Sequence, residues 1–328
     1  MRKKWLGDYA TMLLIWVGLI ILFGAMSEHF LSARTLRTLA NQIPTLTVVA
    51  VGMTFVLIIG GIDLSVGSIL GLCGAVVGVA MADWQWGLTS ALMLSILVGT
   101  VAGAFNGAVS VYLRVPSFIV TLGMMEMARG LAYMCTGSQT KYIGSAVEGI
   151  SQPIKGLGIS GAFLFAVVVV AVGQVLLNRM VFGRRLIAIG TNESAARLAG
   201  LETRHPQLVV FVLIGALTGL GAVFLTSRYG TADPNAGGGF ELSAIAAVVI
   251  GGTSLMGGRG SVVNTFFGVL IIATLSTGLA QVGASEPLKR LITGGVIVAA
   301  GVMDVWKHRM GGGPAALLKR FFSKDKQS

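Results

Sequence analysis

The chain has 328 residues, of which 54% are hydrophobic and only 11% are charged, and its formal net charge is +11. A soluble domain carries about 25% charged residues, because its surface has to face water. Several uninterrupted apolar runs also reach the roughly 20 residues that span a bilayer. This composition excludes a soluble enzyme and predicts an all-α fold, a polytopic membrane helical bundle.

The apolar runs predict about ten transmembrane helices within a single transmembrane domain, 1–305. The first run, 9–26, follows three basic residues and is too long for the core of a signal peptide, so we interpret it as an uncleaved span. The other runs are 43–60, 64–82, 88–112, 117–135, 161–178, 208–227, 241–258, 261–280 and 288–305.

The distribution of positive charge predicts the orientation. If the N-terminus is cytoplasmic and the spans alternate, the inner segments hold 16 Lys and Arg residues and the outer segments hold 7. This asymmetry follows the positive-inside rule, so both the N- and C-termini are expected in the cytoplasm. Attraction to anionic membrane lipid explains the rest of the net charge, and no nucleic acid is expected as a partner. The basic cytoplasmic tail, 306–328, is expected to lie on the inner leaflet.

The cytoplasmic loop 179–207 contains the signature of a short helix. Asn192 suits the N-cap, Glu193 suits the first turn, and Gly200 suits the C-terminal cap. A helix of about two turns is not stable alone in water, so something has to hold it.

Small side chains indicate what could hold that helix. Ala195 and Ala199 lie four residues apart and share a face, with Ala196 beside them. Such a face fits deep into the groove of a partner, while arginines such as Arg197 keep the loop on the cytoplasmic side. The alternative is a surface helix that packs on its own protein.

Four segments carry patterns specific to one family. They are the loop pattern N-x-x-A-A-x-x-x-G, VGMTFVLIIGGIDLSVGS (51–68), VPSFIVTLGMMEMARGLAY (115–133) and GFELSAIAAVVIGGTSLMGGRGS (239–261). Together they resemble the permease subunit of ABC importers for sugars of the ribose, xylose and arabinose type. The resemblance extends over nearly all of residues 43–305.

This resemblance implies a multi-pass permease of the bacterial inner (plasma) membrane that works with a second permease copy, as a homodimer or a related heterodimer. It also implies a cytoplasmic ABC ATPase subunit, which would hold ATP and magnesium, and a periplasmic sugar-binding protein. The loop helix would couple the ATPase to the permease. Ser243 and Asn264 stand where the family commonly has Asp and Gly. The identity of the sugar therefore stays open, and a branched-chain amino acid is an alternative solute.

Two glycine pairs interrupt apolar runs in similar contexts, GGIDLSVG and GGTSLMGG. Broken helices in corresponding halves of a transporter mark its translocation path, although a chance repeat is the alternative. Both breaks fall near cytoplasmic ends of spans, which favours a gate, and Asp63 is expected to cap the next helix. The gate candidates are Gly60, Gly61, Asp63, Ser65, Gly67, Gly251, Gly252, Thr253 and Ser254.

Two charged residues lie inside the span 117–135. Glu126 and Arg129 are three residues apart, and intramembrane charges usually face a bundle interior or an aqueous cavity. They could contact sugar hydroxyls, or form a local ion pair from which Arg129 extends to the interface. The pathway candidates are Ser117, Phe118, Thr121, Glu126, Arg129 and Glu241.

The sequence has no phosphate-binding G-x-x-x-x-G-K-[ST] motif and no catalytic motif, so the chain is expected to be no enzyme and to hold no cofactor. Cys73 and Cys135 lie in apolar runs and the histidines are scattered, which predicts neither a disulfide nor a metal site. An ion-coupled secondary transporter is the alternative class. It should have carboxylates near the midplane of the membrane, and only Glu126 clearly qualifies.

Overall fold

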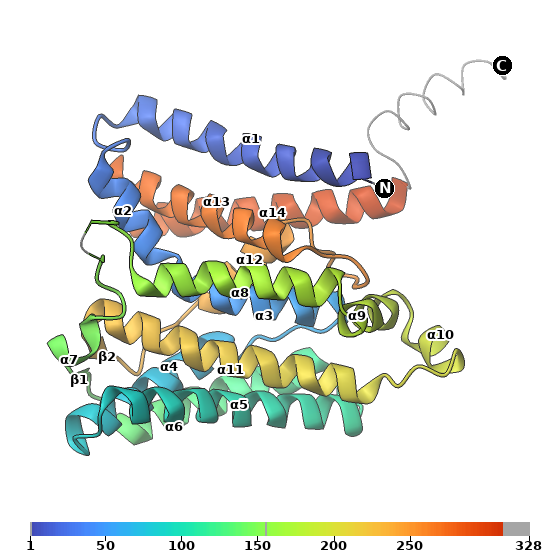
Figure 1. Cartoon of the computed structure of the whole chain (residues 1–328), viewed down its shortest axis with the longest axis horizontal. Helices are drawn as coiled ribbons and strands as arrows, with labels where there is room; N and C mark the ends of the chain where they lie inside the picture. Colours follow the sequence, from blue (N-terminus) through green and yellow to red (C-terminus); the bar gives the residue numbers. More distant parts are fainter. Residues whose placement is uncertain (1, 155, 311–328) are drawn as a thin grey trace.

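The computed structural model describes residues 2–154 and 156–310, which form a bundle of roughly aligned helices (Figure 1). The longer elements are α1 (Arg2–Met26), α3 (Pro44–Ile58), α4 (Val66–Gly78), α5 (Leu88–Tyr112), α6 (Ser117–Thr136), α8 (Gly161–Asn178), α9 (Val181–Thr191), α11 (Arg204–Tyr229), α12 (Phe240–Ile250), α13 (Val262–Gln281) and α14 (Glu286–Met310). The shorter ones are α2 (Ala33–Gln42), the π-helical turn η1 (Val79–Asp83), α7 (Ser145–Glu148), α10 (Glu193–Leu198), β1 (Lys141–Tyr142) and β2 (Thr231–Ala232). The predicted tail 306–328 extends beyond the described residues.

Each predicted apolar run contains a helix, but the helices are not all of spanning length. Among the described residues, 6 helices are long and apolar enough to cross a membrane, or up to 7 if α2 and α3, which meet at 43°, are one span. The predicted run 241–258 is helical only as α12, which has 11 residues, because the chain turns at Gly251 and Gly252. The prediction of ten spans is therefore not confirmed.

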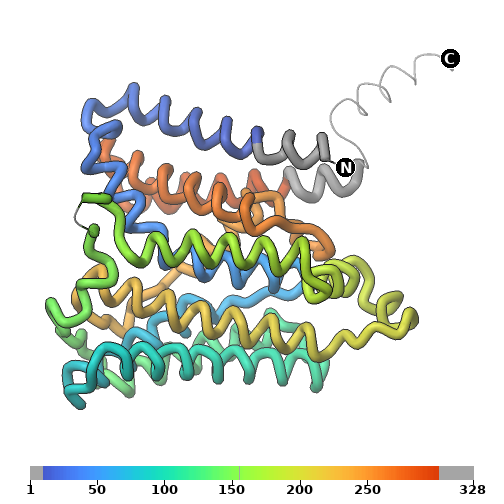
Figure 2. The backbone as a smooth tube through the Cα atoms, viewed as in Figure 1, coloured from blue at the N-terminus to red at the C-terminus, as the bar shows by residue number. Residues whose placement is uncertain are grey.

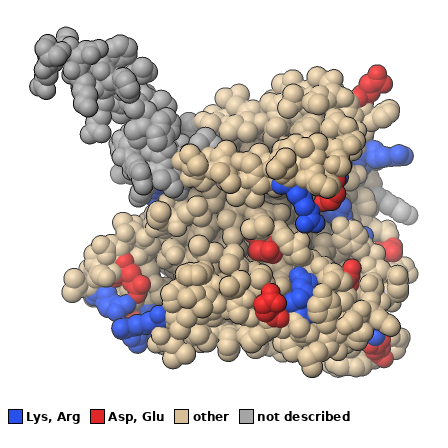
Figure 3. All heavy atoms as spheres, turned by 180° about the vertical axis from the view of Figure 1, so that it is seen from behind, with Lys and Arg blue, Asp and Glu red and all other residues tan. Residues whose placement is uncertain are grey.

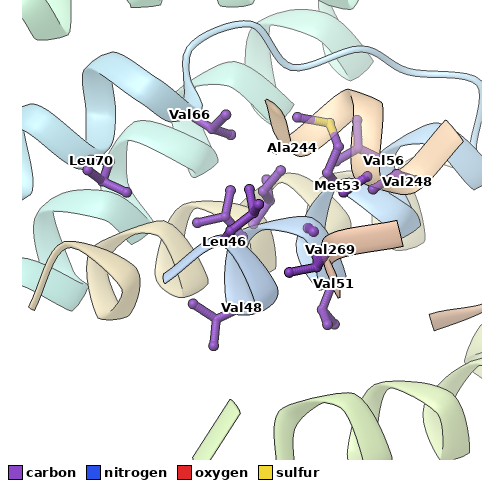
Figure 4. Close-up of a cluster of buried hydrophobic side chains, with 14 of the residues drawn as sticks. Leu46, Val48, Val51, Met53, Val56, Val66, Leu70, Ala244, Val248 and Val269 are labelled. Carbon is purple, nitrogen blue, oxygen red and sulfur yellow. The ribbon is translucent and has the colours of Figure 1, made fainter. Parts of the chain in front are cut away.

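The centre of the bundle is a dry apolar core built around α3. All residues of α3 are buried, as expected for a helix that is apolar on every side. It contacts α8, α11, α12 and α13. Figure 4 shows side chains of α3 such as Met53 and Val56 beside Ala244 and Val248 of α12 and Val269 of α13.

Glycine allows the closest helix pair, α5 with α11, to approach backbone to backbone. A Cβ atom added to Gly215 would overlap the carbonyl oxygen of Gly99, and it would lie 3.0 Å from the Cα of Gly103. Small residues at helix crossings are how membrane helices associate, because lipid supplies no hydrophobic driving force between them. The high glycine content of the chain is thus used in packing.

The two ends of the bundle differ. The loop with α9 and α10 projects from one end, where α1 begins and α14 ends (Figure 1); we call this the α10 end. At the other end, β1 and β2 pair antiparallel, with Lys141 opposite Ala232 and Tyr142 opposite Thr231; we call this the β end. Figure 2 shows that the chain leaves α3 at the α10 end and returns toward α4 without a helix.

Candidate functional site

The short helix predicted in the cytoplasmic loop is present as α10, with the predicted ends. The side chain of Asn192 accepts a hydrogen bond from the backbone N–H of Ala195 at 2.9 Å. Gly200, just after the C-cap residue, has a φ of +81°, which a side chain would rarely allow. Local capping therefore defines α10, while its coupling role remains a prediction.

Glu193 connects α10 to the start of α11. Its Oε1 accepts hydrogen bonds from Arg197 at 2.6 Å and from the hydroxyl of Thr203 at 3.1 Å. Burial raises the pKa of Glu193, but the hydrogen bonds from Arg197, Gln207 and Thr203 outweigh it, and the pKa is lowered overall. A charged Glu193 thus holds the two sides of the loop together.

The three alanines of α10 do not share one outward face. Ala195 and Ala199 are exposed, as predicted for a docking surface, but Ala196 is only 6% exposed and packs on its own protein. Leu198, the large apolar residue of the helix, is 91% exposed. The outward surface of α10 is therefore formed around Leu198, and the inclusion of Ala196 in that surface was wrong.

Break 1, residues 59–65, is an extended segment held by the side chains of α6. Gly60 has a φ of +77° just after the end of α3. The hydroxyl of Ser117 accepts from the N–H of Ile62 at 3.0 Å, and that of Thr121 accepts from the N–H of Leu64 at 3.1 Å. Non-helical backbone inside a membrane protein needs such substitutes for helical hydrogen bonds. Ser117 and Thr121, predicted as pathway residues, therefore stabilise the backbone of the segment that contains the first gate candidates.

Asp63 does not cap the helix that follows it. It is 1% exposed, and its Oδ1 accepts from both the N–H and the hydroxyl of Ser65, at 2.9 and 2.5 Å. Because Asp63 binds Ser65 in this local turn, α4 begins only at Val66, without a side-chain cap. Asn106 of α5, a residue that the sequence did not single out, donates to the Ser65 hydroxyl at 2.9 Å.

Break 2, residues 251–261, is a compact turn formed largely by its own residues, including a bond from the N–H of Met256 to the hydroxyl of Ser254 at 3.2 Å. The N–H of Ser254 bonds the carbonyl of Arg259 at 3.0 Å, and the N–H of Gly257 bonds the carbonyl of Ser254 at 3.2 Å. Gly252, Gly257 and Gly258 all have positive φ. The buried hydroxyl of Thr253 has no hydrogen-bond partner in the described part of the chain.

Both breaks meet the end of α9 at one point, which we call the glycine junction (Ile58, Gly190 and Gly258). The N–H of Gly258 donates to the carbonyl of Ile58 at 2.8 Å. A Cβ atom added to Gly190 would overlap that carbonyl oxygen and lie 2.6 Å from the nitrogen of Gly258. Because α10 follows α9 directly, these backbone contacts connect α10 to both breaks. Gly190 carried no signal in the sequence beyond being a glycine.

A cavity of about 360 Å³ separates break 1 from α10. Gly60 and Gly61 line it on one side, Glu193 and Arg197 on the other, and Arg114 also borders it. Arg114 lies in the turn between α5 and α6 with a φ of 58°. The α10 end therefore combines two interrupted helices, a short exposed helix and basic side chains.

Of the remaining pathway candidates, Arg129 and Glu241 lie at or near the loop 233–239. Phe118 and Glu126 are instead exposed on α6. Arg129 donates to the carbonyl oxygens of Pro234 and Ala236, the latter at 2.9 Å, and so fixes the 233–239 loop at the β end. It is not paired with Glu126, which is exposed, as is Phe118. The local ion pair between Glu126 and Arg129, one of the two alternatives that the sequence left open, is therefore not formed.

Two further candidates lie close together near that loop. Glu241 begins α12 half-buried, and a Cβ atom added to Gly67 of α4 would overlap its Oε2. Gly67 therefore lies in the first turn of α4, directly after break 1, and packs against Glu241. Among the described residues, no group of three or more His, Cys, Asp or Glu side chains is placed to hold a metal ion.

Comparison with known proteins identifies the class of this bundle. Residues 35–301 match the family model described as "Branched-chain amino acid transport system / permease component". The chain belongs to this family of permeases and is a multi-pass membrane protein. The resemblance inferred from the sequence motifs is confirmed.

Individual relatives are similar over most of their length. The ribose import permease protein RbsC of Bacillus subtilis (strain 168) is 39% identical over 290 residues, covering 87% of this chain and 89% of the relative. RbsC of Escherichia coli (strain K12) is 34% identical over 309 residues, covering 92% and 95%. The D-allose transport system permease protein AlsC of Escherichia coli (strain K12) is 33% identical over 298 residues, covering 90% and 91%. No solved structure matches significantly.

Proposed function

We propose that this chain is the permease subunit of an ATP-driven ABC importer that moves a small sugar, a pentose or related monosaccharide, across the bacterial inner membrane. The observation that carries the proposal is the glycine junction, which links the exposed helix α10 to both helix breaks. Relatives named for ribose and allose transport favour a sugar over a branched-chain amino acid. The energy would come from ATP hydrolysis in a partner subunit.

The proposed topology has ten crossings with both termini in the cytoplasm. An even number of crossings is supported by the arrangement in Figure 1, where α1 begins and α14 ends at the α10 end. The charge asymmetry of 16 to 7 supports placing that end in the cytoplasm. The shorter helices α3 and α12 would then cross together with the breaks that follow them.

The proposed partners occupy the two ends. An ABC ATPase, holding ATP and magnesium, docks on α10, and a periplasmic sugar-binding protein docks at the β end. A second permease copy lies beside the first in the lipid. ATP binding and hydrolysis displace α10, and the displacement passes through Gly190 to the carbonyl of Ile58 and the N–H of Gly258. The bundle then exposes its pathway alternately to each side.

Leu198→Glu tests the docking role of α10. Leu198 is 91% exposed, so the carboxylate would leave the fold intact but would place a charge in the interface with the ATPase. We expect ATPase binding and ATP-driven sugar uptake in proteoliposomes to fall by about tenfold or more, as for a central interface residue.

The matched control is Leu157→Glu, which introduces the same charge at an exposed leucine, 61% exposed, in the loop before α8. It should leave ATPase binding unchanged. Ala196→Glu is less suitable, because Ala196 is buried and its substitution would disturb α10 itself. Unchanged ATPase binding in Leu198→Glu, or sugar transport by the purified permease alone, would contradict the proposal.

A further inference from the structure

The cavity between break 1 and α10 is bordered by more basic than acidic side chains. Three arginines line it, Arg114, Arg197 and Arg204, together with one carboxylate, that of Glu193. The arginines come from the turn between α5 and α6, from α10 and from the start of α11. Arg197 pairs with Glu193 at 2.6 Å, so its charge is offset within the loop. The cavity therefore keeps the positive charge of two arginines.

These two arginines have no described partner. No described ion pair or side-chain hydrogen bond includes Arg114 or Arg204, and both residues are exposed at the α10 end. Arg114 has a φ of 58°, which residues other than glycine rarely adopt and which is common at ligand sites. Figure 3, the view from behind, shows basic and acidic side chains gathered at this end of the bundle, on the left. The cavity thus offers two guanidinium groups whose donors no described contact uses.

The starts of two long helices add to the positive potential of the cavity. Pro116 and Ser117 line it where α6 begins, and Arg204 and Gln207 line it where α11 begins. Neither start has a side-chain cap. The N–H groups in the first turn of a helix carry a partial positive charge that favours a nearby anion. Backbone and side chains therefore favour an anion in the same place.

The size and chemistry of the cavity favour a phosphate group. Its volume of about 360 Å³ lies at the lower end of the range for small-molecule sites, roughly 300–1,000 Å³. Guanidinium groups bind phosphate oxygens through two parallel hydrogen bonds, a geometry that a halide ion cannot use. Ser110 and Gln207 also line the cavity and can bind hydroxyl groups next to the phosphate. A small phosphorylated compound matches these features.

We propose that this cavity binds a phosphate group through Arg114 and Arg204, and that the bound group restrains α10 relative to break 1. Arg204 follows α10 in the same loop, whereas Arg114 lies just before Ser117, which binds the N–H of Ile62 in break 1. A phosphate held by both arginines joins the two sides of the cavity. A displacement of α10 has to break this link, so the ligand should slow transport. The effect on transport rests on the proposed function, whereas the binding does not.

Binding of inorganic phosphate to the purified full chain tests the site. In a maltoside detergent, which has no phosphate group, and at constant ionic strength, calorimetry should show saturable binding. Arg114→Gln and Arg204→Gln should each weaken it by about tenfold or more, because a charged donor pair is lost. Glu193→Gln should strengthen it, because a negative charge leaves the lining of the cavity. Misfolding would not produce effects of opposite sign.

The matched control is Arg185→Gln. Arg185 is an exposed arginine of α9 that does not line the cavity, so its substitution removes the same charge from the same loop. It should leave phosphate binding unchanged. Absence of saturable binding, or equal weakening by Arg185→Gln and Arg204→Gln, would overturn the site.

Phosphatidylglycerol separates two sources of the phosphate group, a soluble compound and a lipid headgroup. Added to the detergent micelles, the lipid should displace inorganic phosphate if its headgroup enters the cavity. Unchanged binding of inorganic phosphate would assign the site to a soluble ligand.

Uptake by proteoliposomes tests the effect on transport. Phosphate on the side of the ATPase should slow sugar uptake, and the concentration that halves uptake should be about tenfold higher for Arg204→Gln than for the unaltered chain. Equal inhibition of both would come from the ATPase and would overturn the role of the cavity in transport. Absence of ATP-driven uptake by the unaltered chain without phosphate would instead overturn the proposed function.

Discussion

The two helix breaks have similar glycine signatures but are stabilised in different ways. Break 1 is extended, and hydroxyl groups of α6, Ser117 and Thr121, bind its backbone. Break 2 is a turn whose own backbone groups bind one another, as in the bond from Ser254 to Arg259. A glycine pair therefore predicts where a helix stops, but not what replaces the hydrogen bonds that are lost. Break 1 depends on side chains of a neighbouring helix, whereas most of the described hydrogen bonds of break 2 join its own residues.

Gly190→Ala should have the largest effect, because it breaks the contact that both interruptions share. The added Cβ would overlap the backbone oxygen of Ile58, which cannot rotate away. We expect a loss of about 1–3 kcal/mol or more in the free energy of unfolding and a loss of sugar uptake. Thermal unfolding of the purified protein measures the first and proteoliposome uptake the second.

Gly18→Ala is the control for that substitution, because nothing lies within 4 Å of a Cβ added there. Equal stability of the two variants would mean that the glycine junction tolerates displacement and does not tie the breaks together.

A pair of isosteric substitutions at the two breaks should have opposite consequences. Thr121→Val removes the hydroxyl that binds both Leu64 and Ile62, and we expect a cost of about 1–3 kcal/mol in the free energy of unfolding from the unpaired backbone groups. Thr253→Val removes a buried hydroxyl without a described partner and should be neutral or slightly stabilising.

Denaturant or thermal unfolding of the two purified variants provides the measurement. A similar loss in the free energy of unfolding of both variants would show that break 2 depends on the Thr253 hydroxyl as break 1 depends on that of Thr121, and the contrast between the breaks would fail.

Acid should produce the smallest effect, at α10. The pKa of Glu193 is lowered in the folded loop, so its contribution to stability is present above the unfolded value of about 4.3 and is lost as the pH falls through the folded pKa. Because its side chain is 42% exposed, the effect is small and local. A spin label at Leu198→Cys should become more mobile as the pH falls below the unfolded pKa of about 4.3.

Glu193→Gln should abolish that pH dependence. Hydrogen exchange at break 2 should not change over the same range, because the described hydrogen bonds of Glu193 go to Arg197 and Thr203 and not to break 2. If hydrogen exchange at break 2 increased over the same pH range in which the spin label on α10 becomes more mobile, α10 and break 2 would unfold as one cooperative unit, and the contrast would fail.

Much of the fold follows from the sequence because apolar length is a local property. The run 161–178 coincides with α8, and 88–112 coincides with α5. The run 241–258 was misjudged because apolar composition continues past Gly251, where the backbone turns. Hydropathy therefore locates apolar segments but does not separate a helix from a buried turn.

Features of the candidate site were likewise predictable only where they depend on residues that are close in the sequence. The cap of α10 was predictable, since Asn192 and Ala195 are three residues apart. The support of Leu64 by Thr121 and the binding of Ala236 by Arg129 join residues separated by 57 and 107 positions, and nothing in one sequence pairs them. The inward position of Ala196 was equally hidden, because the pattern of a helix of 6 residues does not tell which side meets its own protein.

The attachment of the 233–239 loop limits how the β end can open. One guanidinium, that of Arg129, holds two carbonyl oxygens of this loop, and the hydroxyl of Tyr133 donates to the side chain of Asn235 at 2.7 Å. The loop is therefore tied to α6 at three points, and we expect it to move together with that helix.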